Sequence, residues 1–405
     1  TLLRAFLETL SFSPTAAQQR VLGEIAADLA RPLPMLRLVQ GDVGSGKTLV
    51  AAGAALQAVA NGYQVAIMAP TEILAEQHWR TFSQWFAPLS IRMEWLSGRT
   101  RGRQRTAALA RIAGGEAALV IGTHALFQAD VAFSRLGLVI VDEQHRFGVH
   151  QRLALTEKAA PEEGRPHQLV MTATPIPRTL SMVAYADLDC SVIDELPPGR
   201  QPVSTALVDS SRRAEVVERV ADACAGGRQA YWVCTLIEES DALQAQAAEA
   251  TAEELRQALP QLQVGLVHGR LKPAEKDAVM AAFKAGDLAL LVATTVIEVG
   301  VDVPNASLMI IEHPDRLGLA QLHQLRGRVG RGSDASHCVL LYQSPLSASG
   351  RQRLGALRES TDGFYIAEKD LELRGPGEVL GTRQTGLMEF RIAELPTHNL
   401  SLIHI

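Results

Sequence analysis

The sequence predicts an α/β protein with two tandem domains of similar size, each built on a parallel sheet, followed by a tail. Short β-branched and aliphatic runs recur along the chain, separated by helix-like segments rich in Ala, Leu and Glu. The runs are continuously apolar rather than alternating, which is typical of strands buried on both faces of a parallel sheet. A proline-rich turn segment, DELPPGRQPV (194–203), divides the runs into two series and indicates a domain boundary.

Each series contributes five expected strands, and each strand ends in polar or small residues. The first series is LRLVQ (36–40), QVAIMAP (64–70), ALVIGTH (118–124), LGLVIVDE (136–143) and QLVMTATP (168–175). The second series is QAYWVCTL (229–236), QVGLVHG (263–269), LALLVATTV (288–296), ASLMIIE (306–312) and HCVLLY (337–342). Ligands of open α/β sheets collect beyond the C-terminal strand ends, so the segments that follow these runs are the places to search for a site.

Composition and charge set limits on the class of protein. The chain has 405 residues, 47% hydrophobic and 20% charged, which is ordinary for a globular protein of two or three domains. Four scattered cysteines without a CxxC pair favour reduced thiols over a disulfide framework or a zinc site. With no signal peptide and no apolar run of about 20 residues, we expect a soluble, cytoplasmic protein without a membrane partner. The net charge of −5 does not point to nucleic acid, but only a contacting groove needs to be basic.

The segment GDVGSGKT matches the phosphate-loop pattern GxxxxGK[ST] in full. It follows an expected strand and precedes the helix-like LVAAGAALQAVA. Its glycines let backbone N–H groups approach phosphate oxygens, and the helix N-terminus adds positive charge. Lys47 is expected to reach the terminal phosphates of ATP, and Thr48 is placed for Mg²⁺. The alternative is a chance Gly-rich turn. The nucleotide-binding residues are Gly41, Asp42, Val43, Gly44, Ser45, Gly46, Lys47 and Thr48.

DEQH begins where the run LGLVIV ends. Asp142 at such a strand end can hold the Mg²⁺ bound to the nucleotide, and Glu143 can position or deprotonate the attacking water. The alternative is a solvated acidic strand end. The next expected strand ends in TATP, where the hydroxyls of Thr172 and Thr174 could hydrogen-bond His145 and link the nucleotide site to a moving part. A plain capped loop would explain TATP as well.

The segment QLRGRVGRG (324–332) carries Arg328 and Arg331, three residues apart and on one side if the segment is helical. Because the second series has no phosphate loop, their economical role is to stabilise charge on the γ-phosphate, as arginine fingers do. ATP would then close a cleft and hydrolysis would reopen it. The alternative is a basic surface helix. A second basic segment, RTRGRQR (99–105), could follow DNA phosphates, and a solvated loop explains it equally well.

Taken together, these segments resemble the motor of a superfamily-two helicase, and more narrowly the RecG family of bacterial ATP-dependent, fork-remodelling DNA helicases. The resemblance covers nearly the whole chain. Beyond the segments above, it is carried by APTEILAEQH (69–78), GTHALF (122–127), DEQHRFG, MTATPIPRTL, VHGRLKPAEK (267–276) and VATTVIEVGVDVPNA (292–306). It implies two RecA-like domains, ATP and Mg²⁺ as cofactors, and 3′–5′ movement on double-stranded DNA. It also implies remodelling of stalled forks and Holliday junctions in recombination and repair.

The resemblance also implies roles for individual residues. PTAAQ (14–18) looks like an adenine-recognising element in which Gln18 reads the base edge, and Gln324, Arg328 and Arg331 match the finger motif. Small and hydroxyl residues suit contact with a phosphate backbone without sequence readout, although a turn or core role would explain each nearly as well. The residues implied to line the DNA groove are Thr71, Gly98, Thr123, His268, Gly269, Thr294 and Thr295.

Residues 361–386 include LRGPGEVLGTRQTG, whose four glycines and one proline argue against a regular element through its middle. In RecG and in the transcription-repair coupling factor Mfd, a helical hairpin and loop in this place couple ATP turnover to movement on duplex DNA. By that resemblance, FYIAEKDLEL forms a helix and the loop carries Arg374, Arg383 and Gln384. The alternative is a passive linker.

We therefore expect an ATP-binding RecA-like domain over 1–196, a C-terminal RecA-like domain over 197–345, a translocation hairpin and loop over 346–395, and a tail over 396–405 that is not native continuation. The wedge domain of RecG proteins has no counterpart here, so we expect a monomeric fragment that retains nucleotide binding. By resemblance its partners are double-stranded and branched DNA and a single-stranded-DNA-binding protein. The alternatives are a Mfd-type translocase and a nucleotide-gated DNA clamp without productive unwinding.

Overall fold

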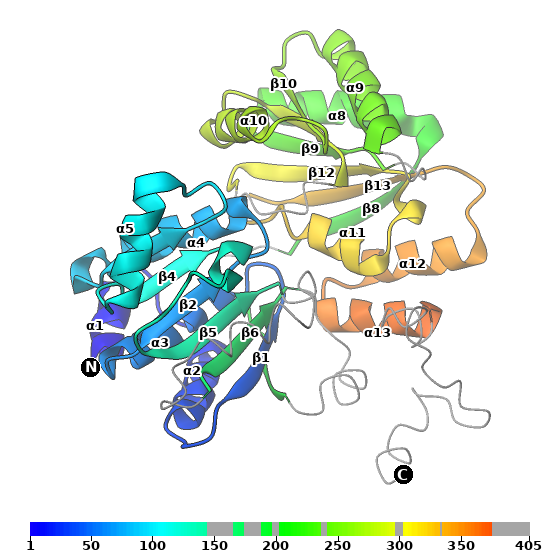
Figure 1. Cartoon of the computed structure of the whole chain (residues 1–405). Helices are drawn as coiled ribbons and strands as arrows, with labels where there is room; N and C mark the ends of the chain where they lie inside the picture. Colours follow the sequence, from blue (N-terminus) through cyan, green and yellow to red (C-terminus); the bar gives the residue numbers. More distant parts are fainter. Residues whose placement is uncertain are drawn as a thin grey trace, which may run out of the picture. The chain divides into compact units, whose positions relative to one another are not determined.

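Figure 1 shows the chain as a computed structural model, which describes residues 1–143, 165–173, 188–196, 202–235, 241–295, 303–332 and 334–374. Contacts divide the chain into two compact units. The first unit comprises Thr1–Ala173 and Asp187–Pro198, and the second comprises Thr174–Ala186 and Gly199–Ile405. The domain boundaries expected from the sequence stay a prediction.

The first unit is a parallel sheet that, in its described part, has seven strands in the order β3-β4-β2-β5-β6-β1-β7. The strands are β1 (Leu36–Gly41), β2 (Gln64–Met68), β3 (Met93–Leu96), β4 (Leu119–Gly122), β5 (Leu136–Asp142), β6 (His167–Thr172) and β7 (Asp189–Ile193). The helices are α1 (Leu2–Thr9), α2 (Ala16–Leu29), α3 (Lys47–Ala60), α4 (Glu72–Phe86) and α5 (Gly102–Ala113).

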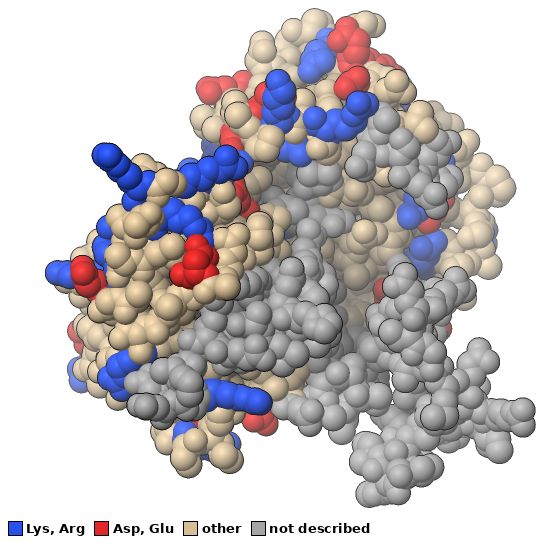
Figure 2. All heavy atoms as spheres, in the orientation of Figure 1, with Lys and Arg blue, Asp and Glu red and all other residues tan. Residues whose placement is uncertain are grey.

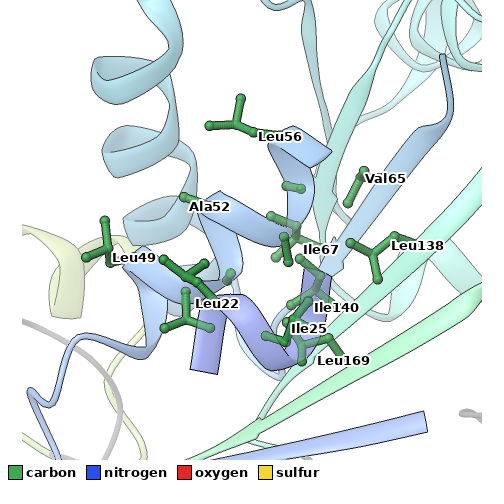
Figure 3. Close-up of a cluster of buried hydrophobic side chains, with 14 of the residues drawn as sticks. Leu22, Ile25, Leu49, Ala52, Leu56, Val65, Ile67, Leu138, Ile140 and Leu169 are labelled. Carbon is green, nitrogen blue, oxygen red and sulfur yellow. The ribbon is translucent and has the colours of Figure 1, made fainter. Parts of the chain in front are cut away.

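Helices α2 and α3 pack against one face of this sheet. Figure 3 shows the resulting core, in which Leu22 and Ile25 from α2 meet Leu49 and Leu56 from α3. On the strand side the same core contains Ile67, Leu138, Ile140 and Leu169. Nine residues of α3 are buried, mostly alanines, which lets the helix that follows β1 lie close to the sheet. The core therefore fixes the start of α3 relative to the ends of β1, β5 and β6.

The second unit repeats this architecture. Its described strands form a parallel sheet in the order β10-β11-β9-β12-β13-β8. They are β8 (Ser204–Asp209), β9 (Gln229–Val233), β10 (Val264–Val267), β11 (Leu290–Ala293), β12 (Ala306–Glu312) and β13 (His337–Tyr342). The helices are α8 (Arg213–Ala225), α9 (Asp241–Ala258), α10 (Pro273–Ala285), α11 (Leu319–Arg326), α12 (Ala348–Glu359) and α13 (Gly363–Arg374).

Helices α12 and α13 form a hairpin that packs on α11 within the second unit. Leu354 and Leu357 of α12 and Ile366 of α13 are buried in the same core as Leu322 of α11. The buried guanidinium of Arg326, at the end of α11, donates to the carbonyls of Leu357 (2.7 Å) and Ser360 (2.7 Å). The end of α11 is thus tied to the turn that joins the two hairpin helices.

The predicted fold class is confirmed: two RecA-like parallel sheets are followed by a helical hairpin. All ten strands predicted from continuous apolar runs are present; β12 and β13 have the predicted bounds, β1 is one residue longer, and the other seven are shorter. Three further strands, β3, β7 and β8, have no predicted counterpart, and all three lie at sheet edges. Each is partly exposed, with burial alternating along β8, so none gives the continuous apolar run that reveals a central strand.

The structure also bears on the cysteines and on a membrane-spanning helix. Cys190, Cys224, Cys234 and Cys338 are all free thiols. Within the described residues, no helix has both the length and the apolar character needed to cross a membrane.

Candidate nucleotide site and associated segments

The phosphate loop joins the end of β1 to the start of α3. Gly44 and Gly46 have φ values of 79° and 85°, in the left-handed region that residues with a Cβ avoid. Gly46 is the N-cap of α3, and no side chain caps this helix start. A helix begins with backbone N–H groups that lack intrahelical acceptors, and the helix dipole adds positive charge there. The predicted phosphate loop thus has a conformation in which the start of α3 could accept an anion; its role stays a prediction.

Glycine is also required here because the loop is closely packed. A Cβ on Gly46 would lie 2.2 Å from Gln18 Nε2, and one on Gly41 would lie 2.5 Å from Ser45 Oγ. Gln18 Nε2 donates to the Ser45 carbonyl (2.8 Å), while Gln18 Oε1 accepts from the Thr15 amide (3.0 Å) in the capping box of α2. The predicted base reader is thus a buried residue that joins the start of α2 to the phosphate loop.

Lys47 directs its ammonium group back over the loop. Its Nζ donates to the carbonyls of Gly41 (2.6 Å) and Asp42 (2.8 Å). Thr48 follows it in the first turn of α3 and is partly buried. Both side chains therefore lie near the C-terminal ends of the parallel strands, beyond the end of β1.

Two carboxylates, those of Asp142 and Glu143, lie at the C-terminal end of β5, on the same side of the sheet as the phosphate loop. Asp142 is the last residue of β5, which pairs with β6, and β6 pairs with β1. Glu143 follows with a φ of 52°, a conformation that costs a non-glycine residue about 1–2 kcal/mol. Its Oε1 accepts from the Ala173 amide (3.3 Å) just beyond β6. Strain of this kind in a charged residue at a strand end is typical of functional sites.

His78 of α4 contacts Asp142 directly. Its Nε2 lies 2.7 Å from Asp142 Oδ2, and both side chains are buried. Burial is the largest single influence and raises the pKa of Asp142, but the His78 hydrogen bond and the charges of His78 and Lys47 outweigh it, so the pKa lies below its ordinary value of 3.8. Asp142 is therefore held as a carboxylate, the form that binds a metal ion.

His78 is absent from the sequence-predicted site. It is the last residue of APTEILAEQH, a segment considered above only as a whole. A histidine on the buried face of an amphipathic helix is ordinarily a core residue. Sixty-four positions separate it from Asp142, and only the packing of α4 on the sheet brings the two together.

This donor set fits Mg²⁺. Magnesium is commonly held by one or two carboxylates together with substrate phosphates, and a phosphate-loop hydroxyl completes the set. The chain offers the ionised Asp142 and the Thr48 hydroxyl at the same sheet edge as the uncapped start of α3. Within the described residues, no group of three or more His, Cys, Asp or Glu forms a metal site of its own. The residues thus suit a metal that arrives with a nucleotide.

The residues predicted to contact DNA follow strand ends in both units. In the first unit, Thr71 caps α4 by accepting from the Leu74 amide (3.3 Å), and Gly98 is exposed in the loop after β3. Thr123 after β4 is buried, and its hydroxyl has no hydrogen-bond partner among the described residues. Thr172 is buried as the last residue of β6.

The second unit places its predicted contact residues in corresponding positions. His268 after β10 is buried, with Nε2 3.3 Å from Glu249 Oε1, and the neighbouring Gly269 is exposed. Thr294 after β11 is buried, and its hydroxyl also lacks a partner in the part of the chain that the structure describes. Thr295 beside it is partly buried. Buried hydroxyls of this kind at strand ends are unusual, because buried polar groups ordinarily have partners.

The finger segment has a different conformation from the helical one considered above. Gln324 lies in α11, which ends at Arg326 with Gly327 as C-cap. Arg328 and Arg331 follow in a turn, where Gly330 has a φ of 80°. The two arginines are therefore not placed on one side of a helix, because α11 ends at Arg326, before both of them. Arg331 Nε donates to the Gly327 carbonyl at 3.5 Å.

Several predicted residues lie outside the described part of the chain. These are His145, Thr174, Arg383 and Gln384; Arg374 is described only as the last residue of α13, without its side chain. The predicted helix FYIAEKDLEL is present within α13.

The basic segment RTRGRQR forms the entry and first turn of α5 rather than a loop alone. Arg99 pairs with Glu72, and Arg105 pairs with Asp130 at 2.9 Å. Arg101 and Arg103 are exposed. Figure 2 shows Lys and Arg side chains gathered over the part of the first unit where α5 lies.

Two tandem parallel sheets, a phosphate loop after the first strand, acidic residues at the end of β5 and an arginine segment in the second unit define a class: the motors of superfamily-two helicases. Comparison with known families agrees. Residues 15–183 match the DEAD/DEAH box helicase family, and 213–333 match the helicase conserved C-terminal domain. Residues 360–401 match domain 3, C-terminal, of the ATP-dependent DNA helicase RecG, a match that continues beyond the expected boundary at 395.

Relatives specify the family. The chain is 67% identical over 396 residues to the ATP-dependent DNA helicase RecG of Escherichia coli K12, covering 98% of this chain and 57% of that protein. It is 48% identical over 394 residues to RecG of Bacillus subtilis, covering 97% and 57%. The chain belongs to the RecG family of ATP-dependent DNA helicases. It spans 57% of the length of these two relatives.

Solved structures agree with this assignment. A RecG bound to a three-way DNA junction superimposes with a TM-score of 0.81 and 43% identity, covering all of this chain and 52% of that one. Dbp5 of Saccharomyces cerevisiae, bound to RNA and ADP BeF3, has a TM-score of 0.64 at 14% identity and shares the fold alone.

Proposed function

We propose that this chain is the motor part of a RecG-type helicase, in which ATP hydrolysis drives movement along double-stranded DNA. By this movement it remodels branched DNA, such as stalled replication forks and Holliday junctions, in recombination and repair. The three-way DNA junction held by the solved relative supports a branched substrate. Membership in a family of ATP-dependent helicases supports nucleotide use.

The observation that carries the proposal is the arrangement at the first unit's sheet edge. An uncapped helix start at Gly46 and the Lys47 ammonium follow β1, and two carboxylates lie at the end of β5, with β6 between these two strands. This combination supports binding of a nucleoside triphosphate with Mg²⁺, in which Lys47 neutralises phosphate charge while Thr48 and Asp142 hold the cation. When bound, the cation would polarise the terminal phosphate.

We propose the remaining nucleotide roles as well, those in the second unit by resemblance to the family. Glu143 is the water-positioning residue, supported by its strained backbone and its contact with the Ala173 amide. Gln18 recognises the base edge, because its amide nitrogen carries a second hydrogen beyond the one given to Ser45. Gln324, Arg328 and Arg331 stabilise charge on the γ-phosphate.

DNA contact is proposed for the strand-end residues of both units. The buried hydroxyls of Thr123 and Thr294 support this role, since each lacks a partner within the described chain and a phosphate oxygen would supply one. Coupling of hydrolysis to movement is assigned to the hairpin α12–α13 and to Arg374, Arg383 and Gln384, with His145, Thr172 and Thr174 connecting the nucleotide site to it. The full set of contact residues is Thr71, Gly98, Thr123, His268, Gly269, Thr294 and Thr295.

The proposal extends to the setting of the motor. Since the family acts on DNA in bacteria, we place the protein in the cytoplasm, acting as a monomer beside a single-stranded-DNA-binding protein. The 3′–5′ polarity of the family is proposed for this chain as well.

The test is steady-state ATP hydrolysis without DNA, with linear duplex and with a synthetic fork. We expect Mg²⁺-dependent hydrolysis that duplex stimulates, and a further gain with the fork if the chain itself recognises branches. Glu143→Gln is the control: it should bind ATP with ordinary affinity and lose turnover by about 10²-fold or more, as expected when a general base is removed.

Two results would count against the proposal. Full turnover by Glu143→Gln would remove Glu143 from its role. Hydrolysis that neither duplex nor fork stimulates would mean that the chain is a nucleotide-binding unit without a grip on DNA.

A further inference from the structure

The contact between His78 and Asp142 connects the nucleotide site to a helix that takes no direct part in nucleotide binding. His78 is 6% exposed, and its Nε2 lies 2.7 Å from Asp142 Oδ2. One turn further along α4, the fully buried Phe82 meets the His78 ring edge-on, with ring centroids 6.2 Å apart. Phe82 packs in turn on Phe86. The imidazole is therefore held in place by packing on one side and by a carboxylate on the other.

The other end of α4 lies at the proposed DNA face of the first unit. Thr71 caps the helix through its hydroxyl oxygen, which leaves the hydroxyl hydrogen available to a phosphate. Glu72 in the first turn pairs with Arg99, and a Cβ on Gly98 would lie 3.8 Å from Glu72 Oε1. The start of α4 and the loop after β3 thus form one connected surface, which contains two of the residues assigned to DNA contact.

Seven residues separate Thr71 from His78, which is about two helical turns or roughly 10 Å along a rigid element. A displacement of the helix start by DNA would move the imidazole as well, because the helix transmits motion along its axis. A carboxylate has two oxygens, so Asp142 can keep its contact with His78 through one and offer the other to a cation.

We propose that His78 is a positioning residue through which DNA contact at the start of α4 controls the orientation of the Asp142 carboxylate, and so the rate of ATP hydrolysis. This inference rests on the proposed function, because it names the residue by which duplex DNA stimulates the same nucleotide site. Outer partners of metal-binding carboxylates act in this way: they fix the ligand's orientation, and their removal costs about 10- to 100-fold in metal affinity or activity.

The experiment compares His78→Ala and His78→Gln with the wild-type chain of 405 residues. Glutamine can place an amide N–H where His78 has Nε2, whereas alanine removes the donor. The first readout is the ratio of ATP turnover with and without linear duplex. The second is the Mg²⁺ concentration that gives half-maximal turnover. The third involves no turnover: the affinity for a fluorescent, non-hydrolysable ATP analogue in Mg²⁺, measured with and without duplex.

The matched control is Ile112→Val. Ile112 is fully buried near the end of α5, in a hydrophobic core that contains neither Phe82 nor Phe86. It should lower the melting temperature, as loss of core packing does, and keep the duplex stimulation of the wild type. Should His78→Ala fail to fold, His78→Leu replaces it, since leucine fills the space without a donor.

In His78→Ala we expect duplex stimulation to fall to a ratio near one and the half-maximal Mg²⁺ concentration to rise about tenfold. The effect of duplex on analogue affinity should disappear in the same variant, because coupling between two ligands is reciprocal. His78→Gln should recover most of each effect.

A His78→Ala protein that duplex stimulates as strongly as the wild type overturns the inference and leaves the proposed function intact. Equal loss of stimulation in Ile112→Val also overturns it, because the role would then be structural. A wild-type chain that neither linear duplex nor a fork stimulates overturns the proposed function, and this inference with it.

Discussion

The first strands of the two sheets, β1 and β8, lead into helices in opposite ways. Each pairs with a late strand of its sheet, β6 or β13. After β1 the chain makes a glycine loop, and α3 starts without a side-chain cap. After β8, Asp209 caps the 3₁₀ turn Ser210–Arg212 that leads into α8, and its carboxylate accepts from the Ser211 amide (2.9 Å) and hydroxyl (2.7 Å) and from the Ser344 hydroxyl.

The difference lies in the group that occupies the helix entrance. An N-terminal turn attracts negative charge, and either a bound anion or a side-chain carboxylate can provide it. In the first unit no side chain caps this position and Lys47 lies beside it, whereas in the second unit Asp209 caps the 3₁₀ turn before α8, and α8 itself begins after Arg212 without a side-chain cap. Hydrogen bonds, with the one from Ser344 contributing most, hold the pKa of Asp209 at about 2. With a shared topology, the turn after the first strand thus lacks an acidic cap in one unit and has one in the other.

Among the substitutions that test this difference between the two units, removal of the Lys47 ammonium should have the largest effect, and that effect is on ATP turnover. Lys47→Ala should reduce ATP turnover by about 10²- to 10³-fold, the usual cost of losing one preorganised donor at a reacting group. Steady-state phosphate release measures it, and circular dichroism checks that the fold persists. Lys284→Ala, at the exposed end of α10, is the matched lysine control. Comparable losses in both variants would contradict a specific role for Lys47.

Placing an acid in the open loop should make the first unit resemble the second. Gly44 is exposed with a φ of 79°, a conformation that Asp and Asn tolerate better than other residues. Gly44→Asp should weaken ATP binding by about 10- to 100-fold more than Gly44→Asn, because only the former adds a charge close to the phosphates. Isothermal titration measures both. Equal affinities in the two variants would show that charge at this position is irrelevant.

Removing the acid of the second unit should affect stability and not nucleotide binding. Because folding lowers the pKa of Asp209 to about 2, its contribution is present above the ordinary pKa of 3.8 and is lost as the pH falls from there through 2. Asp209→Asn should therefore show weaker protection of the Ser211 and Arg213 amides in hydrogen exchange at pH 6 than the wild type. The two proteins should converge towards pH 2. A lower ATP affinity in this variant would contradict the separation of the two helix entrances.

The smallest expected effect is that of Ser344→Ala. It removes the hydrogen bond that contributes most to lowering the pKa of Asp209, so this pKa should rise towards its ordinary value while the two bonds from Ser211 persist. NMR titration of the Asp209 carboxylate measures the change. An unchanged pKa would show that Ser211 alone sets it.

Much of the fold could be predicted because the relevant signals are local. Central strands are buried on both faces, so β1, β5 and β12 appear as continuous apolar runs. Edge strands such as β7 and β8 are partly exposed to solvent, so their sequences are not continuous apolar runs. The helix considered for Arg328 and Arg331 ends at Arg326 with Gly327 as its C-cap, and Gly330 has a positive φ in the turn that follows. The roles of the predicted site residues stay predictions. The fold explains only why many of them lie at strand ends.

The sequence by itself determined the features that depend on neighbouring residues: the parallel sheets, the glycine loop with its left-handed turns, and the acidic end of β5. Only the tertiary structure decided which distant groups meet. It brings His78 to Asp142 across 64 positions and Arg326 to Ser360 across 34. It also brings the Ser344 hydroxyl to the Asp209 carboxylate across 135 positions, at the turn that precedes α8. The physical reason is that backbone preferences act within a few residues, whereas buried polar groups must find partners wherever packing places them.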